Sequence, residues 1–154
     1  MVICKDITLT HFLNVDLDIY SRSNLQPLLT VLGKKVIVLH VGRDTRTFCA
    51  HLELARVTDT ADATIRGFCA LIRTLPKAER DLWDRAKVRD FNVGVQAALS
   101  PFSHEIVLSA ETVSAASEIG ARILFTVYAP VMRPKRTRKV QSRPQKTMRS
   151  PAAS

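Results

Sequence analysis

The sequence predicts an α+β domain over residues 1–130 and a disordered basic tail over residues 131–154. Apolar residues alternate at period two in several short segments, which is typical of strands with one buried face. Between these segments they follow the helical period, and beyond Tyr128 neither pattern continues. About 130 residues of ordinary composition can bury one core, so a single domain is the simplest organisation.

Most of the net charge of the chain lies in the tail. Residues 131–154 include three prolines and no acidic residue. The eight basic residues of the tail are Arg133, Lys135, Arg136, Arg138, Lys139, Arg143, Lys146 and Arg149. Without these eight, the 23 basic residues of the chain fall to 15, against 14 acidic ones, so the domain is nearly neutral. A segment rich in Pro, Ser, Lys and Arg cannot bury enough apolar surface to order itself, which predicts disorder.

The first predicted elements are a strand and a short helix. Residues 13–20 alternate between apolar and polar, which indicates one buried and one open face. The inward set is Leu13, Val15, Leu17 and Ile19, and the outward set is Asn14, Asp16, Asp18 and Tyr20. Ser23 is expected to cap the following helix, with Gln26 completing a capping box, and Gly33 to end it.

A pair of strands is expected next. Residues 36–41 are apolar apart from His40, which predicts a strand covered on both faces. Residues 42–44 are expected to turn the chain into a second strand. The inward residues of that strand are Phe48, Ala50, Leu52 and Leu54, and the outward ones are Cys49, His51 and Glu53.

Two helices and a strand follow this pair. The first helix begins near Ala61 and is broken at Pro76, which is well suited to the first turn of the second helix. The apolar stripe of the first helix is Ile65, Phe68, Cys69 and Ile72, and that of the second is Leu82, Trp83 and Ala86. The next strand turns Phe91, Val93, Val95 and Ala97 inward and Asp90, Asn92 and Gln96 outward.

The last predicted unit has a short strand at residues 105–108, a helix from the cap Ser109 to Gly120, and a strand at residues 123–128. The apolar stripe of this helix is Val113, Ala116 and Ile119. The order of elements predicts a ferredoxin-like split βαβ core (β-α-β-β-α-β) with an added β-α-β unit. Such a core would place the first strand between the third and the fourth.

The segment from His104 to Ala129 has a recognisable pattern: a strand, Ser109 at the start of a helix of small residues, Gly120, and a strand ending in Tyr128. In this pattern it resembles the C-terminal end of a family of small bacterial α/β domains of unknown function. The order of elements extends the likeness over most of residues 9–130. A tryptophan that such domains often carry near the second or third strand is missing, because Trp83 lies in a helix. The resemblance implies a fold but no established chemistry.

The outward positions of the predicted strands are the candidate interaction site. Helices cover one face of such a sheet, and the residues on the other face are mainly acidic and polar. The candidates are Asp16, Asp18, His51, Glu53, Asp90 and Asn92. This set could bind a protein partner, it could form an acid–base or metal site, or it could be a solvated or covered polar face. A reader of single-stranded RNA would need aromatic side chains and positive charge here, which argues against that class.

Sequence motifs give little support for an enzyme. The phosphate-binding, dinucleotide-binding, zincin and serine-hydrolase motifs are absent, so we expect no cofactor, no metal and no catalytic residue. Cys49 and His51 point to the same side of one strand, but at two-residue spacing they would lie roughly 6 to 7 Å apart. Cys69 falls on an apolar helix stripe, where a buried thiol is ordinary.

Three functions therefore stay open. The first is a non-enzymatic cytoplasmic module that binds a protein partner, or a second copy of itself, through a sheet face or edge strand. The second is a nucleic-acid-associated protein whose tail contacts phosphates. The third is an enzyme or metal-binding protein using the acidic face. No membrane contact is expected, because no apolar run approaches the length of a membrane span. A cytoplasmic location is expected because the odd number of cysteines, Cys4, Cys49 and Cys69, fits reduced thiols better than a disulfide framework.

Overall fold

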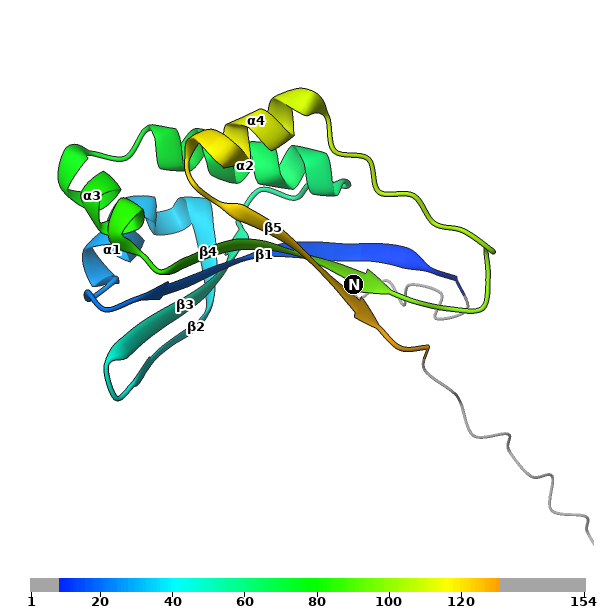
Figure 1. The fold of residues 1–154 in the computed structure, drawn as a ribbon, viewed down its shortest axis with the longest axis horizontal. Coiled ribbons are helices and arrows are strands. Elements are labelled where there is room, and N and C mark those ends of the chain that lie inside the picture. The colour runs from blue at the N-terminus through cyan, green and yellow to red at the C-terminus, as the bar shows by residue number, and fades with distance from the viewer. Residues whose placement is uncertain (1–8, 131–154) are drawn as a thin grey trace, which may run out of the picture.

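The structure is a computed structural model, and it describes residues 9–130 (Figure 1). The protein has a mixed α+β fold with a five-stranded sheet and four α-helices in this range. In chain order the elements are β1 (His11–Ser21), α1 (Gln26–Leu32), the 3-10 turn η1 (Gly33–Lys35), β2 (Val36–Asp44), β3 (Thr47–Leu54), α2 (Ala61–Arg73), α3 (Lys77–Arg85), β4 (Val88–Gln96), α4 (Ala110–Glu118) and β5 (Arg122–Tyr128).

The strand order of the sheet is β2-β3-β1-β4-β5. β1 lies between β3 and β4 and is antiparallel to both, while β2 is antiparallel to β3. β5 is parallel to β4, which requires the crossover through α4. The helices lie together on one face of the sheet (Figure 1). The other face therefore has no helix over it, and β5 extends the sheet at its edge instead of covering that face.

The core forms between the helices and the inward residues of the central strands. In β1, Val15, Leu17 and Ile19 are buried, as their alternation predicts. The whole predicted stripe of α2 is also buried, and Phe68 of this helix stacks on Phe91 of β4 with 5.7 Å between the ring centroids. Burying side chains of this size stabilises the fold by about 1.5 to 3 kcal/mol each.

Capping side chains fix where α2 and α4 begin. The hydroxyl of Thr60 accepts a hydrogen bond from the Ala63 amide at the start of α2. Ser109 accepts one from the Thr112 amide and so caps α4, which confirms the predicted start of that helix. Gly120, with φ of 67°, lies in the left-handed region that ends a helix at low cost.

The sequence predictions for α1 and for the β2–β3 turn are wrong in detail. Ser23 does not cap α1; the amide of Gln26 instead donates to the side chain of Asn24. The turn falls at residues 45–46 because strand pairing continues to the pair Asp44 and Thr47. Thr45 then takes a positive φ of 36° to close this two-residue turn.

Strand β2 is not covered on both faces, contrary to the prediction for residues 36–41. It is an edge strand, and beyond Val36 its apolar side chains are about half exposed. An apolar run is typical of a central strand, and the sequence pattern does not say whether a neighbour is present. Residues 105–108 were expected to form a strand, but they have no regular structure.

Two predicted inward side chains are also misplaced. The register of β1 shifts between Phe12 and Val15, and this bulge brings Leu13 close to Gly94, on the open face. Val113 is half exposed on α4, where the buried side chains are Thr112, Ala115 and Ala116. The eight tail residues proposed for nucleic acid lie outside the described residues. None of the helices in residues 9–130 has the length and hydropathy that a membrane crossing requires.

Candidate functional site

The six candidate residues lie together on the open face of the sheet. They come from the three central strands, where the register places Asp16 opposite both Glu53 of β3 and Asn92 of β4. The next residue of β1 on the same face, Asp18, lies opposite both His51 and Asp90. Side chains directly opposite one another on one face are close enough to interact. The structure therefore brings together the whole set that the alternation predicted; Asn14 lies on this face as predicted, and Leu13 joins it through the bulge in β1.

Asp18 and His51 form the closest pair in this cluster. The Nδ1 atom of His51 lies 2.6 Å from Asp18 Oδ1, and the amide of Asn92 donates to Asp18 Oδ2 over 3.3 Å. On the other side of the ring, His51 Nε2 lies 3.5 Å from the Tyr20 hydroxyl. A carboxylate at Nδ1 fixes the tautomer and the orientation of the imidazole. This arrangement can hold or move a proton, but it is only partly buried.

Asp16 and Glu53 form an acidic pair beside it. One amide, that of Asn14, donates to Asp16 Oδ1 over 2.9 Å and to Glu53 Oε1 over 2.6 Å. The pKa of Asp16 is raised to about 6, first by burial and then by the negative charges of Glu53 and Asp18. Asp16 therefore takes up a proton close to neutral pH, which an isolated aspartate does not.

Strand β5 adds two residues that the sequence argument missed. Arg122 forms a two-pronged ion pair with Asp90, with both N–O distances at 2.7 Å, and the pKa of Arg122 is raised by this contact. Thr126 donates to the side-chain oxygen of Asn92 over 2.7 Å. No sequence signal identified these partners, because only the parallel pairing of β5 with β4 brings them to the face.

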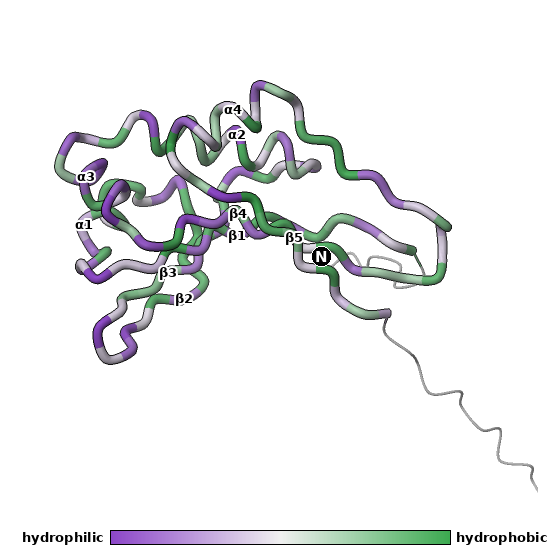
Figure 2. The backbone as a smooth tube through the Cα atoms, viewed as in Figure 1, coloured by the Kyte–Doolittle hydropathy of each residue, from purple (hydrophilic) through white to green (hydrophobic). Residues whose placement is uncertain are grey.

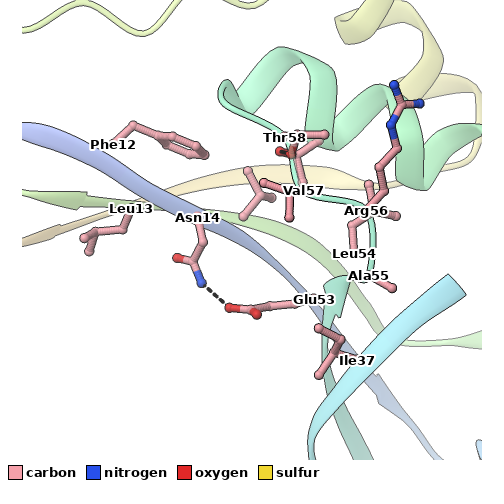
Figure 3. A pocket seen from close by; sticks show the side chains of 12 residues that line it. Phe12, Leu13, Asn14, Ile37, Glu53, Leu54, Ala55, Arg56, Val57 and Thr58 are labelled. Carbon is pink, nitrogen blue, oxygen red and sulfur yellow. Dashed lines mark hydrogen bonds between the residues drawn. The ribbon is translucent and has the colours of Figure 1, made fainter. Parts of the chain in front are cut away.

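A cavity of about 210 Å³ opens at the end of this face where β1 bulges (Figure 3). The hydrogen bond between Asn14 and Glu53 lies at its edge, and Ile37 of β2 and Val57 contribute apolar surface. Asp18 and His51 do not line the cavity. The acid–base pair and the cavity are therefore adjacent features of the face but do not form one pocket.

Neither Cys49 nor Cys69 bonds to the cluster, and Cys4 lies outside the described residues. Cys49 is a half-buried free thiol on the same face as His51, beside Gly42, and it has no hydrogen bond or ion pair in the described part of the chain. Cys69 is buried in the core, and burial raises its pKa to about 11, so it stays a protonated thiol. Within residues 9–130, no three His, Cys, Asp or Glu side chains gather as metal ligands would.

The polar groups of the face mostly satisfy one another. Hydrogen bonds connect Thr126 to Asn92, Asn92 to Asp18, and Asp18 to His51. No buried polar side-chain atom in the described range lacks a hydrogen-bond partner. A network of this kind rigidifies the sheet and fixes its register. It leaves few groups directed toward an incoming substrate.

Comparison with known proteins gives no relative on which to base a function. No family model matches the chain, and neither the curated proteins nor the solved structures that were searched contain a match. The likeness of residues 9–130 to the family of small bacterial domains stays a prediction. Function must be argued from the geometry of this chain.

Proposed function

We propose that this protein is a non-enzymatic interaction module that assembles with a second copy of itself through the edge strand β2. The observation that carries the proposal is the exposure of the apolar side chains on this strand. Ile37, Val38, Leu39 and Val41 are 47% to 50% exposed. Figure 2 shows apolar residues along this edge of the sheet.

An edge strand of this kind is unusual in a chain that stays alone. The outward backbone N–H and C=O groups of an edge can pair with another strand, and proteins usually protect such edges with charges, proline or a covering segment. Within residues 9–130 no segment covers the centre of β2, and its charged residues, Arg43 and Asp44, lie at the hairpin end; its one irregularity is the register shift between Val38 and His40. Pairing with a partner strand would satisfy the backbone and bury the apolar side chains together.

A second copy is the occupant that β2 fits best, because the strand is complementary to itself. Pairing of β2 with β3 is irregular between Val38 and His40, so Ile37 and His40 lie on the open face while Val38 and Val41 lie on the helix side of the sheet. A two-fold axis that pairs two copies of β2 antiparallel would bring the exposed side chains of Ile37, Val38 and Leu39 against the apolar edge of the other copy and would give both copies the same contacts. The two sheets would join into one across the dimer.

The same proposal treats the core as ferredoxin-like with an added β-α-β unit. The order β2-β3-β1-β4, with β1 between β3 and β4 and all neighbours antiparallel, supports this. Of the added unit, the structure has the helix α4 and the strand β5, which pairs in parallel with β4, while the strand predicted at residues 105–108 is missing. The cluster of Asp16, Asp18, His51, Glu53 and Asn92 then lies on the open face beside the edge, as a polar surface that a partner would also contact, while Asp90 is buried in its ion pair with Arg122.

The test is the oligomeric state of the full chain, measured by light scattering during size-exclusion chromatography. Wild-type protein should elute as a dimer at micromolar concentration. Leu39→Lys, which places a charge in the centre of the edge, should convert it to a monomer. The matched control is Leu124→Lys on β5, since Leu124 is also exposed on the opposite edge of the sheet; this variant should stay dimeric. A monomeric wild type, or a dimer that survives Leu39→Lys, would refute the proposal.

A second candidate is nucleic-acid binding through the tail. It rests on the eight basic residues and the absence of acidic ones in residues 131–154. Each phosphate that the tail neutralises would release counterions and make the affinity fall with salt. This function does not exclude assembly through β2.

A further inference from the structure

A basic hollow of about 450 Å³ lies at the end of the sheet where the β2–β3 hairpin turns. Its lining residues are Arg22, Arg43, Arg46, Thr47, Phe48 and Lys87. Four of these six residues are cationic and none is acidic. The hairpin tip is also clearly hydrophilic in Figure 2, in contrast to the centre of β2.

Antiparallel strand pairing brings these four basic residues to one end of the sheet. Arg22 follows the last residue of β1, and Lys87 precedes the first residue of β4. Arg43 lies near the end of β2, and Arg46 is in the turn before β3. Strands that run in opposite directions bring the end of one to the start of its neighbour, so residues distant in sequence share one end of the sheet.

The four cations lack the counterions that other basic residues have. Elsewhere, Arg66 pairs with Asp62, Lys77 with Asp81, Arg80 with Asp84, Arg73 with Glu118 and Arg122 with Asp90. Within the described range, none of the four cations of the hollow has a carboxylate within ion-pair distance. Asp44, next to Arg43, neither lines the hollow nor pairs with any of them. The hollow therefore concentrates uncompensated positive charge in a domain that is nearly neutral.

Part of the site is held in place without a ligand. The guanidinium carbon of Arg43 lies 5.0 Å from the centroid of the Phe48 ring, on the cross-strand neighbour. Such a cation–π contact orients the guanidinium while leaving its N–H groups free to donate. The backbone of Lys87 is fixed by a hydrogen bond from its amide to the Tyr20 carbonyl, at 2.7 Å. A site built on strand ends loses less entropy on binding than one built on a loose loop.

We propose that this hollow binds a phosphate group. Like charges that gather without counterions repel one another, and a bound anion removes that cost. Arginine donates paired N–H groups in a fork that matches phosphate oxygens, and lysine adds a point charge. The phosphate could belong to a small phosphorylated ligand or to the backbone of a polynucleotide, since both present the same anionic oxygens. The site depends neither on assembly through β2 nor on the basic tail.

The test compares two charge-matched double variants of the full chain. Arg43→Gln with Arg46→Gln removes two cations from the hollow, and Lys77→Gln with Arg80→Gln removes two from the exposed face of α3. The probes are inorganic pyrophosphate, followed by calorimetry, and a short single-stranded oligonucleotide, followed by fluorescence anisotropy. The hollow variant should bind at least one probe about tenfold more weakly than wild type, because two charge-assisted donors are removed from the site. The α3 variant should bind within about twofold of wild type.

The two probes identify the source of the phosphate. Loss of pyrophosphate binding assigns the hollow to small phosphorylated ligands, and loss confined to the oligonucleotide assigns it to a polynucleotide. Equal losses in both double variants, or no loss in the hollow variant, would overturn the proposal. Circular dichroism checks that each variant is folded, and Arg22→Gln with Lys87→Gln replaces the hollow variant if Arg43 proves necessary for folding. The tail contributes equally to every variant, so it cancels in the comparison.

Discussion

Asp16 lies on the central strand of the sheet between Glu53 and Asn92, where an ionised carboxylate is disfavoured. Burial removes water from it, and Glu53 and Asp18 add negative charge, so its pKa rises from 3.8 to about 6. A carboxyl group whose pKa is raised by folding stabilises the native state only while it is protonated. The contribution is complete below about pH 4 and is lost as the pH rises through about 6.

We predict that Asp16→Asn stabilises the protein at alkaline pH. The substitution removes the charge and keeps an oxygen that can accept the hydrogen bond from Asn14. The free energy of unfolding should rise by about 1 to 3 kcal/mol at about pH 8, allowing for partial solvent screening, and the gain should vanish near pH 4. Urea denaturation between these two pH values measures the change in the free energy of unfolding. Asp81→Asn on α3 is the control, and an equal, pH-independent change in both variants would contradict the account.

The sequence was sufficient to identify which residues share the open face, but not the contacts they make. Period-two alternation assigned Asp16, Asp18 and His51 to one side, because successive side chains on a strand point to opposite faces. The partner Arg122 could not be predicted, since nothing local shows that β5 pairs in parallel with β4. Leu13 was misplaced because a bulge shifts the register by one residue, which reverses the face of the side chain.

At the scale of elements, the sequence could not distinguish an edge strand from a central one. The apolar residues of β2 resemble those of a strand covered on both sides, yet among residues 9–130 only β3 pairs with it. Strand order depends on contacts between residues far apart in the chain. Helix starts were easier to predict, as Ser109 shows, because a cap is a local feature.

Trp83 connects two helices that are far apart in sequence. Its ring is buried, and its indole N–H donates to the carbonyl of Ile119, the C-cap residue of α4, over 2.8 Å. This bond satisfies one of the carbonyls that a helix end leaves without a partner. It also explains why the chain has its one tryptophan in α3 and not in a strand.

We predict that Trp83→Phe destabilises the protein by about 1 to 3 kcal/mol. The phenyl ring fills most of the space but leaves the buried carbonyl of Ile119 without its donor. Thermal unfolding followed by circular dichroism measures the change. Phe102→Leu is the control, because Phe102 is fully exposed and its replacement should change stability by less than about 0.5 kcal/mol. A Trp83→Phe protein as stable as this control would show that the hydrogen bond contributes nothing.

At the scale of the whole molecule, positive charge is unevenly distributed: residues 1–130 are nearly neutral and residues 131–154 are strongly basic. Every helix and strand in the structure ends by Tyr128. Residues 9–130 by themselves form a continuous core cluster. Folding and tail-mediated binding should therefore be separable.

We predict that truncation after Pro130 leaves the melting temperature nearly unchanged and removes the contribution of the tail to salt-sensitive binding of duplex DNA. The domain keeps its whole core, while the affinity due to phosphate neutralisation disappears with the tail. Thermal melts and a filter-binding titration at two salt concentrations measure the two effects. A large loss of stability would show that the tail is structural, and duplex binding that survives truncation would assign it to the folded domain.

Amide hydrogen exchange of the full chain at increasing protein concentration tests assembly through β2 most directly. The outward-facing amides of β2 have no partner strand in the monomer, so pairing with a second copy should slow their exchange as concentration rises. The amides of β5, on the opposite edge, should exchange at the same rate throughout. Exchange in β2 that does not depend on concentration, or protection that arises at β5 instead, would contradict the account.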